Sequence, residues 1–387
     1  MRSEALITST RTNLTLLVGT TKGAFLICGG NDRSGWAVQG PYCDGWPINH
    51  VVGDPETGTL WAGGGGEWHG AGIWCSEDGG TNWKVTRLTK GKMDDWAAND
   101  THFAKMIGWT SEPLPFADTF AQIWSLGYAH GTLYAGTKPA SLLASENGGK
   151  DWERIRALTD HPSAGSWNPG GAGLVLHTIV SDPGDPKKLW VGISAAGVFA
   201  TEDGGETWER RNRLSNAEAG SHHDHPAAPR DGDIGHCIHN MMRAPGTSDL
   251  LYQQNHYGVW RSADGGRSWD DRTKGLPSTF GFPIRVHPRD PNTIWTLPLN
   301  GDMPDVFHST QPQRSGGRAT VAIPGKRCVR VCHRRAASSL CSVKQWLVTS
   351  VIRRASISAQ TVVRYSRAWM KVKIGRKSRA TCQRYLL

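Results

Sequence analysis

The stretch Thr201-Glu-Asp203-Gly204-Gly205-Glu-Thr-Trp208 decides the fold, because close copies of it occur three more times in the 387-residue chain. At the position of Asp203, these copies have residues Asp78, Asn147 and Asp264. Asp and Asn side chains accept hydrogen bonds from backbone amides ahead of them, and glycines adopt positive φ angles without strain. Each copy therefore predicts a hairpin turn whose acidic residue is structural rather than catalytic, with the Trp at the start of the next strand.

Short strands are expected to repeat around each turn. Next to Asp203, four strands, which we name a to d, are expected at 176–180, 189–192, 197–200 and 207–210. The same order fits the other three turns, whereas Leu14 to Trp36 supplies only strands b, c and d of a first unit. Four-stranded sheets that repeat along a chain bury their faces against one another and pack radially. The sequence thus predicts an all-β fold, a β-propeller of four-stranded blades over residues 1–310.

These turns and strands resemble those of bacterial BNR-repeat propellers, whose turn motif is called the Asp box, and more distantly those of xyloglucanase and Vps10-type propellers. The resemblance covers about residues 14–310. It implies seven blades, of which this chain retains about six, and a sialidase-like or glycosyl-hydrolase-like protein. The Phe/Tyr-Arg-Ile-Pro motif of sialidases is absent near the N-terminus, however, and Gly281-Phe-Pro-Ile-Arg285 is a different sequence. A single propeller also lacks the cleft between two propellers that the xyloglucanase resemblance implies.

The candidate binding residues gather on one face, which we call the top face. The long insertions between strand d of one blade and strand a of the next share this face and are expected at about 89–120, 160–172 and 215–235. Matching starts of strand a are expected at His50, His177 and His239. The predicted ligand-binding residues, rich in His and Trp, are His50, Trp68, His69, Trp167, His177, His222, His223, His225, His239, His256 and Arg285.

Three interpretations of these residues stay open. The histidines at the strand starts can bond the backbone of a neighbouring blade while those in the loops are solvated. Alternatively, His and Trp side chains can hold a sugar or another small ligand by stacking and hydrogen bonding. Metal ligation is the third interpretation and the least favoured, so neither a metal site nor a cofactor is predicted.

Two functions also stay open. One is a glycosidase or lyase acting on a sugar at the top face, with Glu67 as the candidate catalytic residue. A glycosidase needs two carboxyl groups facing the substrate, and no pair of acids stands out. The other is a non-catalytic binding or assembly-factor propeller. In both cases the expected partner is a small-molecule or glycan ligand, and neither a nucleic acid nor a membrane is expected.

The last part of the chain departs from the repeat. All 34 acidic residues lie at or before Asp305, whereas residues 311–387 contain 18 of the 44 Lys and Arg residues and no acid. A basic arm that binds nucleic acid, with aromatic residues available to stack on bases, is one explanation. The genetic code favours another, a shifted reading frame.

Codons made of the third base of one codon and the first two of the next turn Trp369-Met370 into Asp and Met370-Lys371 into Glu. The neighbouring codons then permit Phe-Ala-Ser-x-Asp-Glu-Gly-x-Asn-Trp, a fifth copy of the turn with its strand. We predict that residues 311–387 are an aberrant basic tail, disordered or mispacked, with a frameshift somewhere in 306–340. The seventh blade would then be missing, and as a frameshift product the chain can have lost its activity.

The remaining features indicate the compartment. The body cysteines, which show no metal-like spacing and are expected to be reduced and buried, are Cys28, Cys43, Cys75 and Cys237. The N-terminus has no basic-then-apolar signal region, and no apolar run approaches the length of a membrane span. A soluble, cytoplasmic protein is therefore expected.

Overall fold

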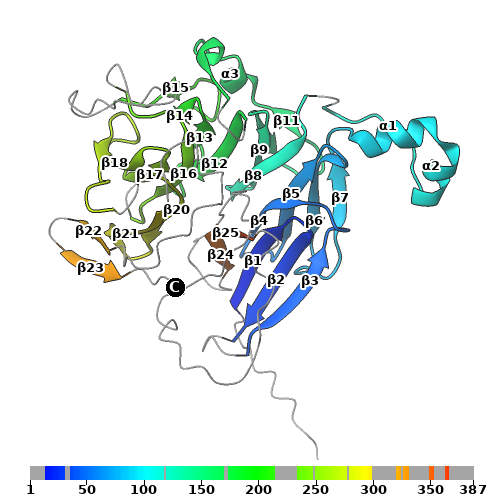
Figure 1. Cartoon of the computed structure of the whole chain (residues 1–387), viewed down its shortest axis with the longest axis horizontal. Helices are drawn as coiled ribbons and strands as arrows, with labels where there is room; N and C mark the ends of the chain where they lie inside the picture. Colours follow the sequence, from blue (N-terminus) through cyan, green and yellow to red (C-terminus); the bar gives the residue numbers. More distant parts are fainter. Residues whose placement is uncertain are drawn as a thin grey trace, which may run out of the picture.

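The computed structural model describes residues 14–30, 35–116, 119–169, 173–213, 233–246, 249–276 and 279–298, together with 320–323, 326–330, 348–352 and 362–365. The fold is mostly β and propeller-like, because successive sheets lie side by side around a common centre (Figure 1). Of the helices in these ranges, none has the length and apolar character needed to cross a bilayer.

Four sheets contain four antiparallel strands each, in chain order. The first consists of β4 (Ile48–Gly53), β5 (Leu60–Gly66), β6 (Gly70–Ser76) and β7 (Lys84–Arg87). The second consists of β8 (Gln122–Ala129), β9 (Thr132–Lys138), β10 (Leu142–Ser145) and β11 (Glu153–Arg154). The third consists of β12 (Val175–Ser181), β13 (Leu189–Ser194), β14 (Gly197–Thr201) and β15 (Glu209–Arg210). The fourth consists of β16 (Ile238–Arg243), β17 (Leu251–Asn255), β18 (Gly258–Ser262) and β19 (Asp270–Asp271).

The remaining strands form less regular sheets. At the start of the chain, β1 (Leu14–Thr20), β2 (Gly23–Gly29) and β3 (Ala37–Tyr42) form strands b, c and d of one sheet. The tail strands β24 (Val348–Ile352) and β25 (Val362–Tyr365) lie beside β1, and the β1–β25 pair is the one parallel pair among the described strands. Two-stranded sheets are formed by β20 (Gly281–His287) with β21 (Asp290–Pro298), and by β22 (Thr320–Ile323) with β23 (Lys326–Arg330).

Short helices lie in the connections between sheets. After β7 come α1 (Lys92–Asn99) and α2 (Thr101–Ile107), which project from the outer side of the sheet β4–β7 (Figure 1). After β11 come α3 (Arg156–Thr159) and the 3₁₀ turn η1 (Ala164–Ser166). The long connections expected at 89–120 and 160–172 thus carry these elements.

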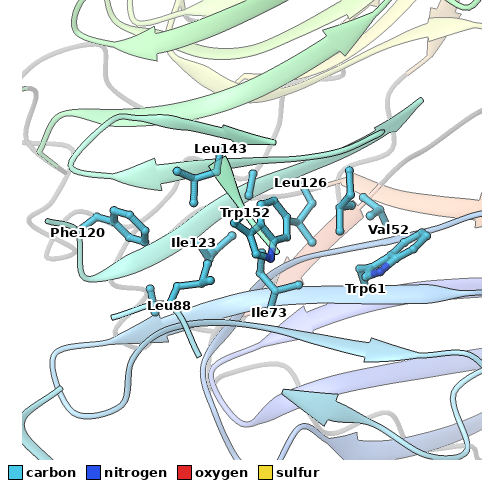
Figure 2. Packing of buried hydrophobic residues seen from close by; sticks show 12 residues of the cluster. Val52, Trp61, Ile73, Leu88, Phe120, Ile123, Leu126, Leu143 and Trp152 are labelled. Carbon is cyan, nitrogen blue, oxygen red and sulfur yellow. The ribbon is translucent and has the colours of Figure 1, made fainter. Parts of the chain in front are cut away.

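The core lies between neighbouring sheets. Between β4–β7 and β8–β11 it includes Trp61, Ile73, Leu126 and Trp152, which interdigitate as shown in Figure 2. Burying a side chain of this size contributes about 1.5–3 kcal/mol each. Because alternate residues of a strand point to opposite faces, each sheet has apolar side chains on both faces and packs on both of its neighbours.

A glycine in strand b receives an aliphatic side chain of the next sheet. A Cβ atom on Gly63 would lie 2.6 Å from Ile123 Cγ2, and one on Gly192 would lie 2.7 Å from Ile238 Cγ2. The same contact pairs Gly136 with Leu176, where a Cβ would lie 2.5 Å from Cδ2. Real Cβ atoms essentially never come so close, so these positions require glycine. The contact recurs because each strand b approaches the next strand a in the same way.

The four turns share a hydrogen bond from the backbone N–H of the fifth residue to Oδ1 of the Asp or Asn. In the first three turns the Trp indole also donates to the carbonyl of the second glycine, whereas Trp269 of the fourth donates to Arg211 O. In the first, Asp78 Oδ1 accepts from the backbone N–H groups of Thr81 (3.0 Å) and Asn82 (2.9 Å), and the Trp83 indole donates to Gly80 O (3.0 Å). The two glycines after Asp78 have φ angles of 73° and 100°. Strand-b tryptophans then join neighbouring sheets at these turns, since Trp61 and Trp190 each donate to a turn carbonyl of the following sheet at 2.8 Å.

The turns also show a complementary pair four residues apart. Where the first residue is Asp, the fifth is a donor: Asn82 donates to Asp78 (2.6 Å), and Ser268 donates to Asp264 (2.6 Å). Where the first residue is Asn147, the roles are reversed, and its amide donates to Asp151 at 2.7 Å. Each turn therefore has one carboxylate and one donor at this pair.

This complementarity predicts the effect of exchanging the pair. Asn147→Asp brings two carboxylates together and should lower the free energy of unfolding by about 1 kcal/mol, the repulsion of two charges about 4 Å apart in water. Adding Asp151→Asn should restore most of the loss, because the pair is complementary again. Urea denaturation of the single and double variants measures both values. A double variant no more stable than Asn147→Asp would contradict the pairing.

The Asp78 turn predicts a pH dependence. Hydrogen bonds, first of all from the backbone of Asn82, lower the pKa of Asp78 to about 2. Because the folded-state pKa lies below that of the unfolded chain, about 3.9, the stabilisation by the charged form is complete above that value and is lost as the pH falls towards 2. Asp78→Asn should therefore be less stable than the wild type at pH 7, and the difference should shrink below pH 4. Urea titrations at both pH values test this, and a difference independent of pH would refute it.

Candidate functional site

Strand a of each four-stranded sheet has a bulge near its first residue. The register shifts fall at the same place in β4, β8, β12 and β16, and the extra residues are Asn49, Trp124, His177 and His239. A shift also occurs in β20, in the segment that contains Phe282. A bulge re-aims the side chain of its extra residue. We call Asn49, Trp124, His177, His239 and Phe282 the inner ring, because they lie on the innermost strands, which pack on one another in sequence (Figure 1).

Members of the inner ring contact one another from sheet to sheet. The Trp124 indole donates to His177 Nδ1 at 3.2 Å, and the rings of His177 and His239 have centroids 6.2 Å apart. The next contact is a stack of His239 on Phe282, with centroids 4.3 Å apart and an interplanar angle of 20°. The bulges thus bring together aromatic side chains that are 43 to 62 residues apart in the sequence.

The expectation that His50, His177 and His239 occupy matching positions is wrong for His50. The bulged residue of β4 is Asn49, so His50 lies one residue further along the strand. Its Nδ1 accepts a hydrogen bond from Leu126 N (2.8 Å) in the next sheet, and burial, with a smaller effect of the Arg285 charge, lowers its pKa to about 3. His50 is therefore a neutral residue that joins two sheets.

Asn49 and His239 make equivalent bonds to the following sheet. Asn49 Nδ2 donates to Ile123 O at 2.6 Å, and His239 Nδ1 lies 2.7 Å from Gly281 O. Each acceptor is the carbonyl just before the next bulge. Since a carbonyl only accepts, Nδ1 of His239 carries the proton and its Nε2 carries the lone pair. Burial and the nearby His177 hold the pKa of His239 well below its usual value, so the ring is neutral.

His239 also belongs to an aromatic cluster beside the ring. Phe280 makes edge contacts with His239 (5.3 Å) and with His256 (4.8 Å). The buried Cys237 completes the group, with its sulfur 3.6 Å from His239 Nε2 and 3.1 Å from Ser194 Oγ. Burial raises the pKa of the Cys237 thiol to about 11, so the free sulfur keeps its proton at neutral pH and is a poor nucleophile.

A second group lies on the turn between β5 and β6. Trp68 is 43% exposed and Trp96, on α1, is 49% exposed, and their rings meet edge to face at 5.9 Å. Trp96 also stacks on Phe103 of α2, with centroids 4.1 Å apart. The backbone N–H groups of Lys92 and Met93 bond the carbonyls of the β5–β6 turn and so hold the start of α1 against it. We call Trp68 and Trp96 the exposed tryptophan pair.

Asp94 makes the support of this pair rigid. Its carboxylate is ion-paired with Arg87, accepts from Gly91 N at 2.8 Å and accepts from the Trp109 indole at 2.9 Å. Although burial raises the pKa of Asp94, these hydrogen bonds outweigh burial and hold the pKa below its usual value. Asp94 is therefore a buried structural anion that positions α1, and a rigid support favours precise binding by the tryptophans.

Glu67 does not have the environment of a glycosidase acid. Its carboxylate is 77% exposed and pairs with Lys92 Nζ at 2.6 Å. The hydrogen bond and charge of Lys92 lower the pKa of Glu67, whereas a catalytic acid needs a raised pKa. The geometry therefore gives Glu67 the role of a surface anion beside Trp68.

Of the other predicted ligand-binding residues, some pack against neighbouring side chains of the sheets and some lie outside the described residues. The half-buried His69 stacks on Trp46 at 4.7 Å, and burial lowers its pKa. Trp167 donates to Ser163 Oγ (3.0 Å) and packs edge-on against Phe199. Arg285 contacts Met242 through Nη1, and burial lowers its pKa to about 9. His222, His223 and His225 lie outside the described residues.

No family model matches the chain. Over 78 residues, 20% of this chain, it is 33% identical to the oligoxyloglucan-reducing end-specific xyloglucanase of Emericella nidulans. That stretch is 9% of the enzyme, so the chain spans only a small part of this curated relative.

Three solved structures illustrate the structural likeness. The chain is 17% identical to the GH74 xyloglucanase from Xanthomonas campestris, with 74% of this chain and 49% of that chain covered and a TM-score of 0.39. The chain is 15% identical to the structure of YCF48 bound to D1 peptide, which covers 75% of this chain and 91% of that chain with a TM-score of 0.31. It is 10% identical to a putative 6-phosphogluconolactonase from Bacteroides uniformis, with 83% of this chain and 82% of that chain covered and a TM-score of 0.48. The repeated four-stranded sheets, more than any of these likenesses, identify the fold as propeller-like.

Proposed function

We propose that this chain is a glycan-binding propeller that holds its ligand on the exposed tryptophan pair, Trp68 and Trp96. The proposal depends on one observation: two large aromatic side chains are about half exposed, have ring centroids 5.9 Å apart and are held by a rigid support. Exposed aromatic side chains that lie together, rather than singly, are typical of interaction and ligand-binding sites. Sugars stack their apolar faces on indole rings while polar neighbours bond the hydroxyl groups, and Glu67 and Lys92 supply such neighbours.

The local similarity to a xyloglucanase supports a sugar as the ligand class. That enzyme, by its name, acts on oligoxyloglucan, and the 33% identity over 78 residues makes xyloglucan oligosaccharides the first ligands to test. The sialidase alternative is weaker, because the half-buried Arg285 donates to the Met242 sulfur and no arginine cluster for a substrate carboxylate is seen among the described residues.

We propose binding without hydrolysis at this surface. Glu67 has a lowered pKa. The carboxylate of the nearby Asp94 is already bonded to Arg87, Gly91 and Trp109. A retaining or inverting glycosidase needs one carboxyl group that stays protonated and a second one across the bond to be cleaved. The described residues of the surface do not offer that combination.

We further propose that residues 311–387 are read in a shifted frame and that the chain of the original frame forms seven closed blades. Strand a of a blade runs antiparallel to strand b, as in all four complete sheets. Next to β1, however, β25 runs parallel over Val18–Thr20, and β24 is antiparallel only over Thr15–Leu17. The tail therefore covers the edge of β1 without reproducing strand a.

The binding proposal predicts the effect of removing either indole. Trp68→Ala and Trp96→Ala should each weaken binding of a xyloglucan oligosaccharide about tenfold or more, the loss of an aromatic anchor worth about 1.4 kcal/mol. Calorimetric titration measures the change. Met106→Ala is the matched control, because Met106 is 67% exposed on the neighbouring α2 and lies outside the pair.

The outcomes separate the functions. Equal affinities for the wild type and both Trp variants would overturn the proposal. Release of reducing sugar that is abolished by Glu67→Gln would instead establish a hydrolase. Binding of a peptide but of no glycan would favour the assembly-factor alternative.

The frame proposal predicts a gain in stability. A frame-restored chain should melt at least about 5 °C higher than this chain, which corresponds to roughly 4 kcal/mol for a protein of this size. It should also aggregate less, because the edge strands are paired. Thermal denaturation and light scattering of the two chains, side by side, measure this. Equal melting temperature and equal solubility would refute the missing blade.

A further inference from the structure

Three potential metal ligands converge where β16 and β17 meet. The ligand atoms of Cys237, His239 and His256 all lie within 4.8 Å of one another. The sheet geometry produces this convergence. Cys237 directly precedes β16 and His239 is the bulged residue of that strand, and the bulge leaves His239 Nε2 3.6 Å from Cys237 Sγ. His256 lies opposite Cys237, since Ile238 pairs with Asn255 and His256 N bonds Cys237 O.

We propose that Cys237, His239 and His256 form a binding site for a zinc ion. Thiolate sulfur and imidazole nitrogen are the ligands that Zn²⁺ prefers. Zn–S and Zn–N bonds of about 2.3 and 2.0–2.1 Å place two ligand atoms of a tetrahedral site about 3.6 Å apart. The distance from Cys237 Sγ to His239 Nε2 is 3.6 Å, so this pair already has the separation that the metal requires.

The surroundings orient the ligands. The Nδ1–H group of His239 is directed to Gly281 O at 2.7 Å, which leaves Nε2 as the metal-binding atom. Metal-bound histidines usually donate their other N–H group to a carbonyl or carboxylate in this manner. The Ser194 hydroxyl, 3.1 Å from the sulfur, can donate to a thiolate. Cys237 and His239 therefore each have an orienting partner.

Apolar residues enclose one side of the site, and the third ligand gives access. Phe282 stacks on His239, and the buried Phe280 contacts both histidines. Cys237 and His239 are buried, whereas His256 is half-buried. A zinc ion with three protein ligands keeps a fourth position for water or a substrate, which is the arrangement of catalytic rather than structural zinc. The site is independent of the exposed tryptophan pair.

The test uses the full chain without a polyhistidine tag, stripped with a chelator and titrated with Zn²⁺ or Co²⁺ alone. The wild type should bind one Zn²⁺ per chain, and the Co²⁺ form should show a thiolate-to-cobalt charge-transfer band. Cys237→Ser should abolish that band, and His256→Asn should weaken Zn²⁺ binding at least about 100-fold, because even partners of ligands contribute 10–100-fold. His256 is half-buried, so its variant keeps the test valid if Cys237→Ser does not fold, as judged by circular dichroism.

Two controls distinguish this site from other histidines. His102→Ala, at an exposed position on α2, should bind Zn²⁺ like the wild type. A triple variant with alanine at His222, His223 and His225 should also retain binding. Loss of Zn²⁺ in the triple variant, a Co²⁺ complex without the sulfur band, or a wild-type chain that takes up no Zn²⁺ would overturn the proposal.

Discussion

The contact between a strand-b glycine and an aliphatic residue of the next strand a is the constraint on which the rest of the structure depends. Gly63, Gly136 and Gly192 each leave room for one such side chain, and so neighbouring sheets approach closely and share a core. The same approach brings the strand-b tryptophans within hydrogen-bonding distance of the next turn. It also sets the inner strands side by side, so that bulged residues touch across sheet boundaries.

The turns and the sheet order could be predicted from the sequence because both depend on local chemistry. Asp or Asn followed by two glycines and a Trp has few other stable conformations. The inner ring could not be predicted with the same accuracy, since a bulge changes the register by one residue without a sequence signal. For this reason the sequence aligns His50 with His177, although Asn49 is the equivalent residue in the structure.

The candidate sites depended on contacts that no local pattern contains. The sequence shows Glu67 as an acid in a loop, but its pairing with Lys92, 25 residues away, lowers its pKa. Trp96 lies in the insertion expected at 89–120, but the sequence does not show that its ring is about half exposed and meets Trp68 edge to face. The cysteine spacing gives no metal signal, because the approach of His256 to Cys237 and His239 requires the β16–β17 pairing.

Among the described sheets, one joint departs from the glycine contact, and this joint differs from those before it in the chain. Between the sheets β16–β19 and β20–β21, the strand-b position is occupied by Gln254 and the strand-a position by Gly281, so the large and small partners are exchanged. Gln254 fills the space with bonds to Thr279 O and from Thr296. The earlier joints have the same glycine-to-aliphatic contact, so one of these sheets could replace another at its joint, as in interchangeable modules. The joint after β19 is selective: a duplicated or transplanted earlier sheet would place an aliphatic side chain against Gln254, and the two side chains would clash.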